Sequence, residues 1–268
     1  MSEGADKADL RGSFQRSVFL GAPFDELTFD QVLRLLESSN AGDNFRYVVT
    51  PNVDHVVKMD RYKNICKYYE GSWLSLCDSK PIFTLSQAFS LDLSHVTGAD
   101  LTGALFESVI EQSDCIALIA ADAQIVTEIR RKFPHVNFSA HVPPMNLAAD
   151  PEAFQKCVEF ATTGRYRFLF IALGSPHSER IAFEVSRNPE SRGVGLCIGA
   201  SLAFLVGTKT RAPRWMRELG LEWFHRLALE PGRLWRRYLY SFLPLIRLFL
   251  VEVRNPPNGI GMKISRLL

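Results

Sequence analysis

Residues 168–176 read FLFIALGSP, the clearest fold signal in the chain. Six consecutive apolar residues are typical of a strand buried on both faces of a sheet, and the Gly174-Ser175-Pro176 sequence after them is a turn signal. The same succession of apolar run and small-residue turn recurs at 194–201, which reads VGLCIGAS. Both stretches therefore predict strands of a parallel sheet that has helices on both faces.

The rest of the chain continues this pattern. Further apolar runs predict strands over 17–20, 47–50, 73–77, 115–120 and 137–142. A 3.6-residue period predicts helices over 29–36, 53–69, 100–112, 123–132, 151–161 and 179–185. Because strands and helices alternate, the fold class is α/β, with a mostly parallel sheet flanked by helices. Right-handed crossovers then bring the carboxyl ends of the strands to one edge, where ligands bind in such sheets.

The composition is that of a folded protein, with 268 residues of which 47% are hydrophobic and 22% charged. It excludes disordered, collagen-like and coiled-coil chains. Five cysteines form no C-x-x-C pair, which favours reduced thiols in a cytoplasmic protein over a disulfide scaffold or a zinc ribbon. No apolar segment of a secretory signal stands at the start. We expect residues 1–15 to be a disordered tail, 16–206 the core and 207–268 an appendage.

Charge separates the core from the appendage. Residues 1–206 carry 19 basic and 25 acidic groups, whereas residues 207–268 carry 12 basic and 4 acidic groups. This asymmetry predicts an anionic partner for the appendage, either phosphate, anionic lipid or nucleic acid, and the alternative is a solvated basic face.

Four predicted strands end in polar or glycine-containing segments: Thr50-Pro51-Asn52, Asp78-Ser79, Gly174-Ser175-Pro176 and Gly199-Ala200-Ser201. Glycine lets a phosphate approach the backbone, and a helix that follows attracts anions at its N-terminus, so a nucleotide or another phosphorylated ligand is expected. The absence of G-x-G-x-x-G after a strand, and of a P-loop, argues against a dinucleotide cofactor and an NTPase. No H-E-x-x-H or Asp-x-Asp pair offers a metal site.

Each polar candidate has a structural alternative. Asp78 is either a general base in a partly dry cleft or the N-cap of a helix that begins near Pro81. Asn52 either binds a sugar hydroxyl or caps the helix at Val53, and the cap is favoured. Thr50 is a ligand contact or simply a strand residue. Glu179 binds a substrate hydroxyl or stands in a first helical turn, where its charge suits the helix dipole. The lone histidines His55, His95 and His177 are interpreted as structural or surface residues.

The appendage carries the more specific signal. On one continuous helix, Arg226, Arg233 and Arg236 would share a face, although Pro231 interrupts or begins a helix. Their guanidinium groups would suit a pyrophosphate. The apolar run 239–251 is too short and too broken to span a bilayer. It predicts contact with a membrane surface, and the alternative is a helix packed on the core.

Several segments together resemble the WecG/TagA/CpsF family of bacterial glycosyltransferases, between about Phe19 and Leu250. They are VVTPNVDHVV (48–57), LCDSKPI (76–82), VTGADL (96–101), LGSPHSE (173–179), IGASLAFLVG (198–207) and RAPRWMRELGLEWFHRLALEPGRLWRRYL (211–239). The last segment is long and unusual, and the shorter ones occur in the order that the family has.

The resemblance implies a Rossmann-like core with a C-terminal helical appendage. It implies an inverting transfer from a UDP-sugar, with N-acetylmannosamine, glucose or a related hexose, to a polyprenyl-diphosphate-linked saccharide in bacterial surface polysaccharide synthesis. The enzyme would work without a metal or other cofactor, as a peripheral protein on the cytoplasmic face of the inner membrane, which the appendage would contact. The sequence is compatible with a homo-oligomer.

The resemblance also implies roles for individual residues. Asp78 matches the proposed catalytic base. The substrate-binding positions comprise the T-P-N motif, the nucleotide-side loops with the glutamate beyond them, and the arginines that would neutralise the UDP leaving group: Thr50, Asn52, Gly174, Ser175, Glu179, Gly199, Arg226, Arg233 and Arg236. The chain departs from the family's usual residues around the donor site at Ser79, His95, Ser178 and Ala203, which bears on donor choice.

Two other readings of the same residues predict different behaviour. A noncatalytic relative that docks on a membrane would show no transfer. An unrelated Rossmann-like enzyme would bind S-adenosylmethionine or NAD(P) instead of UDP. A nucleic-acid partner is disfavoured, because the aromatic residues of the appendage lie in apolar runs.

Overall fold

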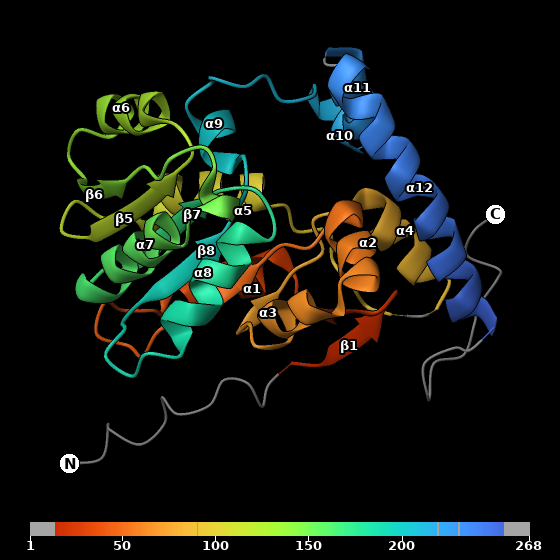
Figure 1. The fold of residues 1–268 in the computed structure, drawn as a ribbon, viewed down its shortest axis with the longest axis horizontal. Coiled ribbons are helices and arrows are strands. Elements are labelled where there is room, and N and C mark those ends of the chain that lie inside the picture. The colour runs from red at the N-terminus through yellow and green to blue at the C-terminus, as the bar shows by residue number, and fades with distance from the viewer. Residues whose placement is uncertain (1–13, 90, 219, 230, 255–268) are drawn as a thin grey trace.

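The computed structural model describes residues 14–89, 91–218, 220–229 and 231–254. Within them, a six-stranded parallel sheet has the order β4-β3-β8-β7-β5-β6 (Figure 1). Its strands are β3 (Arg46–Val49), β4 (Leu74–Ser75), β5 (Cys115–Ala120), β6 (Asn137–His141), β7 (Phe168–Ala172) and β8 (Val194–Cys197). The predicted α/β fold, with a Rossmann-like parallel sheet, is confirmed.

The apolar run at β7 explains why the sheet is covered on both faces. All five residues of β7 are buried. Leu169 and Ile171 belong to one hydrophobic cluster, while Phe168 and Phe170 belong to the other. Successive side chains of a strand point to opposite faces, so a strand that is apolar throughout needs a cover on each side.

Two groups of helices supply these covers. One face packs against α1 (Phe29–Glu37), α5 (Gly98–Ala104), α6 (Ala123–Lys132) and α9 (Ser201–Leu205). The other packs against α2 (Val53–Arg61), α3 (Cys66–Glu70), α4 (Lys80–Gln87), α7 (Pro151–Thr163) and α8 (His177–Ser186). Burying apolar surface at about 25 cal/mol per Å² is the main force that holds these layers together.

The local structure differs from the sequence prediction at several places. The strand at 17–20 is β1 (Arg16–Phe19), which pairs with β2 (Ala22–Asp25) in an antiparallel hairpin outside the main sheet. The predicted helix over 53–69 is divided into α2 and α3 by a 3₁₀ turn at Lys63–Ile65. The helix predicted over 100–112 begins at Gly98, and its last turn, Leu105–Val109, is a π-helix.

Within 207–254, apart from the undescribed residues 219 and 230, the segment expected to form the appendage contains three helices: α10 (Arg214–Glu218), α11 (Glu222–Leu229) and α12 (Pro231–Arg254). One side of α12 lies against the core, where Leu245 is buried and the Phe249 ring meets the Phe89 ring at 5.8 Å between centroids. Arg247 of α12 also pairs with Asp60 of α2 at 3.5 Å. The structure therefore shows the core-packing alternative for this side of the helix.

Other apolar side chains of α12 are exposed. They include Trp235 near the start of the helix and, further along, Tyr240, Phe242, Leu243, Ile246, Leu250 and Val251. We call the six from Tyr240 to Val251 the apolar face of α12. Across the described residues, no helix has both the length and the hydropathy needed to cross a bilayer.

Candidate active site

The four polar strand ends form one continuous row. Strands β4, β3, β8 and β7 are neighbours in the sheet and run parallel, so the segments that follow them meet at one edge. This confirms that the sequence motifs are brought together. Figure 1 shows the appendage beside the same part of the molecule, next to α2 and α4.

Asp78 lies at the end of β4 in this row. Its backbone amide donates to the Pro51 carbonyl at 3.1 Å. Its Oδ2 accepts a hydrogen bond at 3.2 Å from the amide of Gly98, the first residue of α5. The N-cap of α4 is Ser79, whose Oγ accepts from the Ile82 amide at 3.3 Å. The capping alternative for Asp78 is therefore wrong, and the partly buried carboxylate faces the start of α5 instead.

Thr50 lies immediately behind this carboxylate site. The buried Thr50 hydroxyl donates to the Cys197 carbonyl at 3.3 Å and so joins the ends of β3 and β8. A Cβ atom placed on Gly98 would lie 3.3 Å from the Thr50 Oγ1 and 3.1 Å from the Ser201 Oγ. A side chain at position 98 would therefore require the Ser201 or Thr50 side chain to shift by a few tenths of an ångström. A sugar contact for Thr50 stays a prediction.

Asn52 caps α2, as the favoured alternative predicted. Its Oδ1 accepts a hydrogen bond from the Asp54 amide at 3.1 Å. Gly199, after β8, has a φ of +52°, and no atom lies within 4 Å of the place a Cβ would take. The backbone of this loop is thus open to an approaching ligand, which suits the nucleotide-side role that remains a prediction.

The Gly174-Ser175-Pro176 loop is tied to α2 and α3. The Ser175 carbonyl accepts from Lys58 Nζ at 3.0 Å, and the Ser175 Oγ lies 3.1 Å from the Tyr69 hydroxyl. Ser178, one of the departures from the family pattern, is buried, and its Oγ accepts from the Leu173 amide at 3.2 Å. A serine at this position therefore holds the turn after β7. No local pattern singled out Lys58 or Tyr69, because neither stands in a strand-end motif.

Glu179 is buried beneath this loop, with 2% of its surface exposed. Its Oε2 has no hydrogen-bond partner among the described residues. Burial raises the pKa of Glu179 to about 7, although the charge of Lys58 works in the opposite direction. A buried carboxylate with an unpaired oxygen is costly unless something binds it, so the structure keeps Glu179 as a candidate for a substrate hydroxyl.

Glu179→Gln tests this burial. Because the pKa of Glu179 is higher in the folded protein than in the unfolded chain, protonation of this carboxyl group favours the folded state. This contribution to stability is fully present below the ordinary pKa of 4.5 and is lost as the pH rises through about 7. Glutamine stays neutral at every pH, so the variant avoids the buried charge. We expect its free energy of unfolding to exceed that of the wild type by about 3 kcal/mol at about pH 8 and to equal it at about pH 4. Urea titrations at both pH values measure this. Glu107→Gln, at an exposed carboxylate, should show no such growth with pH, and a constant difference for Glu179→Gln would contradict the assignment.

The three predicted appendage arginines are divided between two helices. Arg226 is on α11, whereas Arg233 and Arg236 are on α12, which begins at Pro231. Pro231 therefore occupies a first helical turn. The side chains of all three arginines lie outside the described residues, so their roles stay predictions.

Two arginines that the sequence analysis did not single out contact α5, whose first residue, Gly98, binds Asp78 of the row. Arg211 and Arg217 both bind Asp100, in the first turn of α5, at 2.7 Å and 3.3 Å. Both stand in segments that carry the family resemblance, but no local pattern indicated that they pair with a residue more than one hundred positions away.

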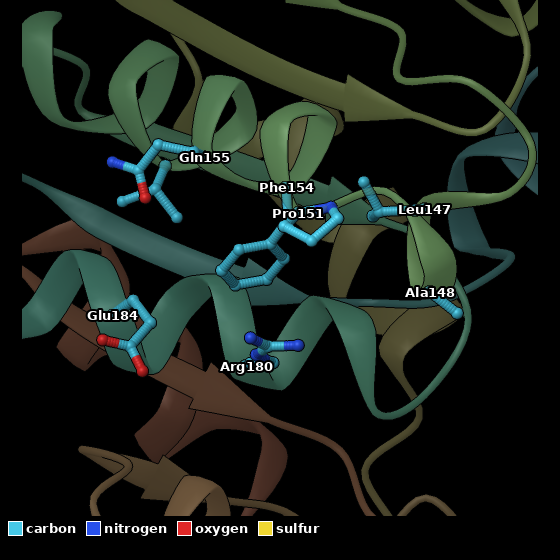
Figure 2. A pocket seen from close by; sticks show the side chains of 8 residues that line it. Leu147, Ala148, Pro151, Phe154, Gln155, Arg180 and Glu184 are labelled. Carbon is cyan, nitrogen blue, oxygen red and sulfur yellow. The ribbon is translucent and has the colours of Figure 1, made fainter.

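A cavity of about 450 Å³ lies apart from this row, between α7 and α8 (Figure 2). The Arg180 guanidinium stacks on the Phe154 ring there, 4.1 Å from its centroid. None of the predicted site residues lines it. Over the described part of the chain, no group of three or more His, Cys, Asp and Glu side chains is placed to hold a metal ion.

Known proteins resemble this chain over most of its length. The sequence profile of a family described as "Glycosyl transferase WecG/TagA/CpsF family" matches residues 17–259. An N-acetylglucosaminyldiphosphoundecaprenol N-acetyl-beta-D-mannosaminyltransferase of Bacillus subtilis (strain 168) is 42% identical over 115 residues, which are 43% of this chain and 42% of that protein. A protein of the same name from Staphylococcus aureus (strain NCTC 8325 / PS 47) is 22% identical over 248 residues, 90% of this chain and 93% of that protein.

Proposed function

Because the chain belongs to the glycosyl transferase WecG/TagA/CpsF family, we propose that it is an inverting enzyme that moves a sugar from a UDP-sugar to a polyprenyl-diphosphate-linked saccharide. That the protein is a glycosyltransferase follows from the family. The donor, an N-acetylmannosamine-type sugar, glucose or a related hexose, and the lipid-linked acceptor belong to the proposal. The names of the two relatives, which specify an N-acetylmannosaminyl group and an N-acetylglucosaminyl diphosphoundecaprenol, support the acceptor class.

The position of Asp78 carries the mechanism. Its carboxylate lies at the carboxyl edge of the sheet, held from one side by the Gly98 amide at 3.2 Å. It would take the proton of the acceptor hydroxyl as that oxygen attacks the anomeric carbon. The new C–O bond forms on the face opposite the bond to UDP, which breaks, so the configuration inverts. The UDP leaves with the negative charge on its terminal phosphate.

That charge has to be stabilised as it develops. In this proposal Arg226, Arg233 and Arg236 of the appendage neutralise it in place of a metal ion. The open backbone at Gly174 and Gly199 would receive the nucleotide side of the donor, and Glu179 would receive a hydroxyl group. These assignments rest on the family motifs and on the row of strand ends that holds them.

The proposal places the protein on the cytoplasmic face of the bacterial inner membrane, because its acceptor would be embedded there. Two observations support a surface contact: the basic excess of residues 207–268 and the apolar face of α12. Such a combination binds anionic membranes in the interfacial plane.

Calorimetry with UDP tests the donor class and the metal independence together. We expect UDP to bind the purified protein with the same affinity, within about twofold, with magnesium or with a chelator, since arginines replace the metal. S-adenosylmethionine and NADPH should not bind. Binding of either of these without UDP would overturn the proposal. An affinity that falls more than about tenfold in the chelator, which corresponds to about 1.4 kcal/mol, would overturn the metal independence alone.

A further inference from the structure

One carboxylate of the core joins the appendage to the active site. Asp100, in the first turn of α5, accepts two hydrogen bonds from Arg211, from Nη1 to Oδ1 at 2.7 Å and from Nη2 to Oδ2 at 2.9 Å. Arg217 of α10 adds a third, from Nη1 to Oδ1 at 3.3 Å. A guanidinium fork that meets both oxygens of a carboxylate fixes the orientation as well as the distance between the partners.

This ion pair is built into the cap of α5. The Thr97 hydroxyl donates to Asp100 Oδ2 at 2.6 Å, and its oxygen accepts from the Asp100 amide at 3.0 Å and from Arg211 Nη2 at 3.1 Å. Burial raises the pKa of Asp100, but the hydrogen bonds from Arg211 and Thr97 outweigh it and hold that pKa below its usual range. The carboxylate is therefore bound in its charged form by groups from both parts of the chain.

The first turn of α5 also holds Asp78. Gly98, which follows Thr97, donates its amide to Asp78 Oδ2 at 3.2 Å. A Cβ added at Gly98 would lie 3.1 Å from the Ser201 Oγ, so this turn packs closely against the segment after β8. Burial lowers the pKa of Arg211, but the hydrogen bonds and charge of Asp100, with smaller contributions from Glu222 and Asp78, outweigh it and raise that pKa. Hydrogen bonds through the Thr97-Gly98 turn thus link Arg211 and Asp100 to the Asp78 carboxylate.

We propose that Asp100 is the docking site of the C-terminal appendage on the core, which we call the seat. Asp100 and Arg211 are then positioning residues that couple the docking of α10 to the placement of Asp78. The inference rests on the proposed function, in which Asp78 is the base. These two residues would then affect turnover. A purely structural ion pair at a surface would affect only stability, and that only slightly. The appendage arginines would reach the leaving group only while this seat is occupied.

A double-mutant cycle on the full-length protein tests the coupling. Its members are Asp100→Asn, Arg211→Gln and the double variant, with Arg211→Lys as the conservative replacement. Asp114→Asn is the matched control, because it breaks a comparable pair with Arg167 (2.8 Å) that precedes the strands instead of following them. Two quantities are measured for each: kcat in the transferase assay, and the rate of tryptic cleavage after the exposed Lys209, in the segment that joins α9 to α10.

We expect each single variant to lower kcat by about 10- to 100-fold, since a misplaced catalytic group can cost that much. Cleavage after Lys209 should become about tenfold faster, because it follows the population of the undocked appendage. The double variant should be no worse than the worse single variant, and Arg211→Lys should retain more activity than Arg211→Gln. The Asp114→Asn control should lower the melting temperature without changing kcat or cleavage at Lys209.

The two readouts separate the inference from the function on which it rests. If cleavage after Lys209 is unchanged in both single variants, Asp100 is not the seat, whatever the enzyme transfers. If cleavage accelerates but kcat per folded molecule does not fall, the seat is purely structural and the coupling to Asp78 is wrong. If the wild type transfers no sugar from any UDP-sugar, the proposed function fails, while the cleavage rates still test the seat.

Discussion

Asp78→Asn should lower sugar transfer by about 10²- to 10⁴-fold, the contribution of a general base, and leave UDP affinity within about threefold. Asparagine has the shape of aspartate, and its side-chain oxygen can still accept the hydrogen bond from the Gly98 amide that the structure shows at 3.2 Å. It cannot take the proton of the acceptor hydroxyl. The measurement is initial rates with a soluble lipid-diphosphate acceptor, beside calorimetry with UDP.

Asp92→Asn provides the control, because Asp92 is exposed in the segment between α4 and α5. It should transfer at the wild-type rate. Retained turnover in Asp78→Asn would remove Asp78 as the base. Loss of UDP affinity together with turnover would instead place Asp78 among the donor contacts, and the base would have to be sought elsewhere on the same row.

The layers of the fold were predictable because they depend on local pattern. The FLFIAL run at 168–173 is apolar at every position, and only a strand covered on both faces suits it. The order of the strands was not predictable in the same way. Strand β8 lies between β3 and β7, and this arrangement depends on crossovers over more than one hundred residues, which no window of sequence contains.

In the candidate site, too, local features were predictable from the sequence and other features were not. The strand ends were identified because each motif directly follows an apolar run, and a parallel sheet gathers them at one edge. The capping alternative for Asp78 could not be rejected from the sequence, because aspartate is a common helix cap and no local pattern indicated that the next residue, Ser79, takes this role. The structure resolves it through the Ile82 amide, which donates to Ser79.

The burial of Glu179 and the pairing of residues far apart in the chain could not be predicted from the sequence. Glu179 looks like an ordinary acidic residue of a first helical turn, and its 2% exposure arises only when α8 packs against the sheet and its neighbouring helices α3 and α7. Asp100 and Arg211 are separated by 111 positions, so their pairing depends on how the appendage returns to the core. Of the two alternatives for α12, core packing is seen at Leu245 and Phe249, whereas membrane contact stays a prediction that the exposed apolar side chains of the same helix support.

Replacing Phe242, Leu243 and Leu250 by serine should weaken binding to anionic vesicles by about 100-fold or more. Full burial of one such side chain stabilises by about 1.5–3 kcal/mol, so partial insertion of three suffices for this effect. All three are exposed, at 61%, 61% and 49%, so the substitutions leave the contacts with the core in place. Vesicles with about one quarter phosphatidylglycerol measure the bound fraction by flotation.

Deleting residues from 207 onward would also reduce binding and turnover, but it uncovers the core beneath Leu245 and Phe249, so substitutions on the exposed side are the sharper test. Met145→Ser, at a fully exposed position after β6, should not change vesicle binding. The triple variant should keep its kcat with a detergent-soluble acceptor, because its three side chains are exposed instead of packed on the core. Unchanged flotation would show that the anchor lies elsewhere. Loss of binding only at high salt would assign the attachment to the arginines of the appendage, whose attraction to anionic headgroups is screened by salt, and not to the apolar face.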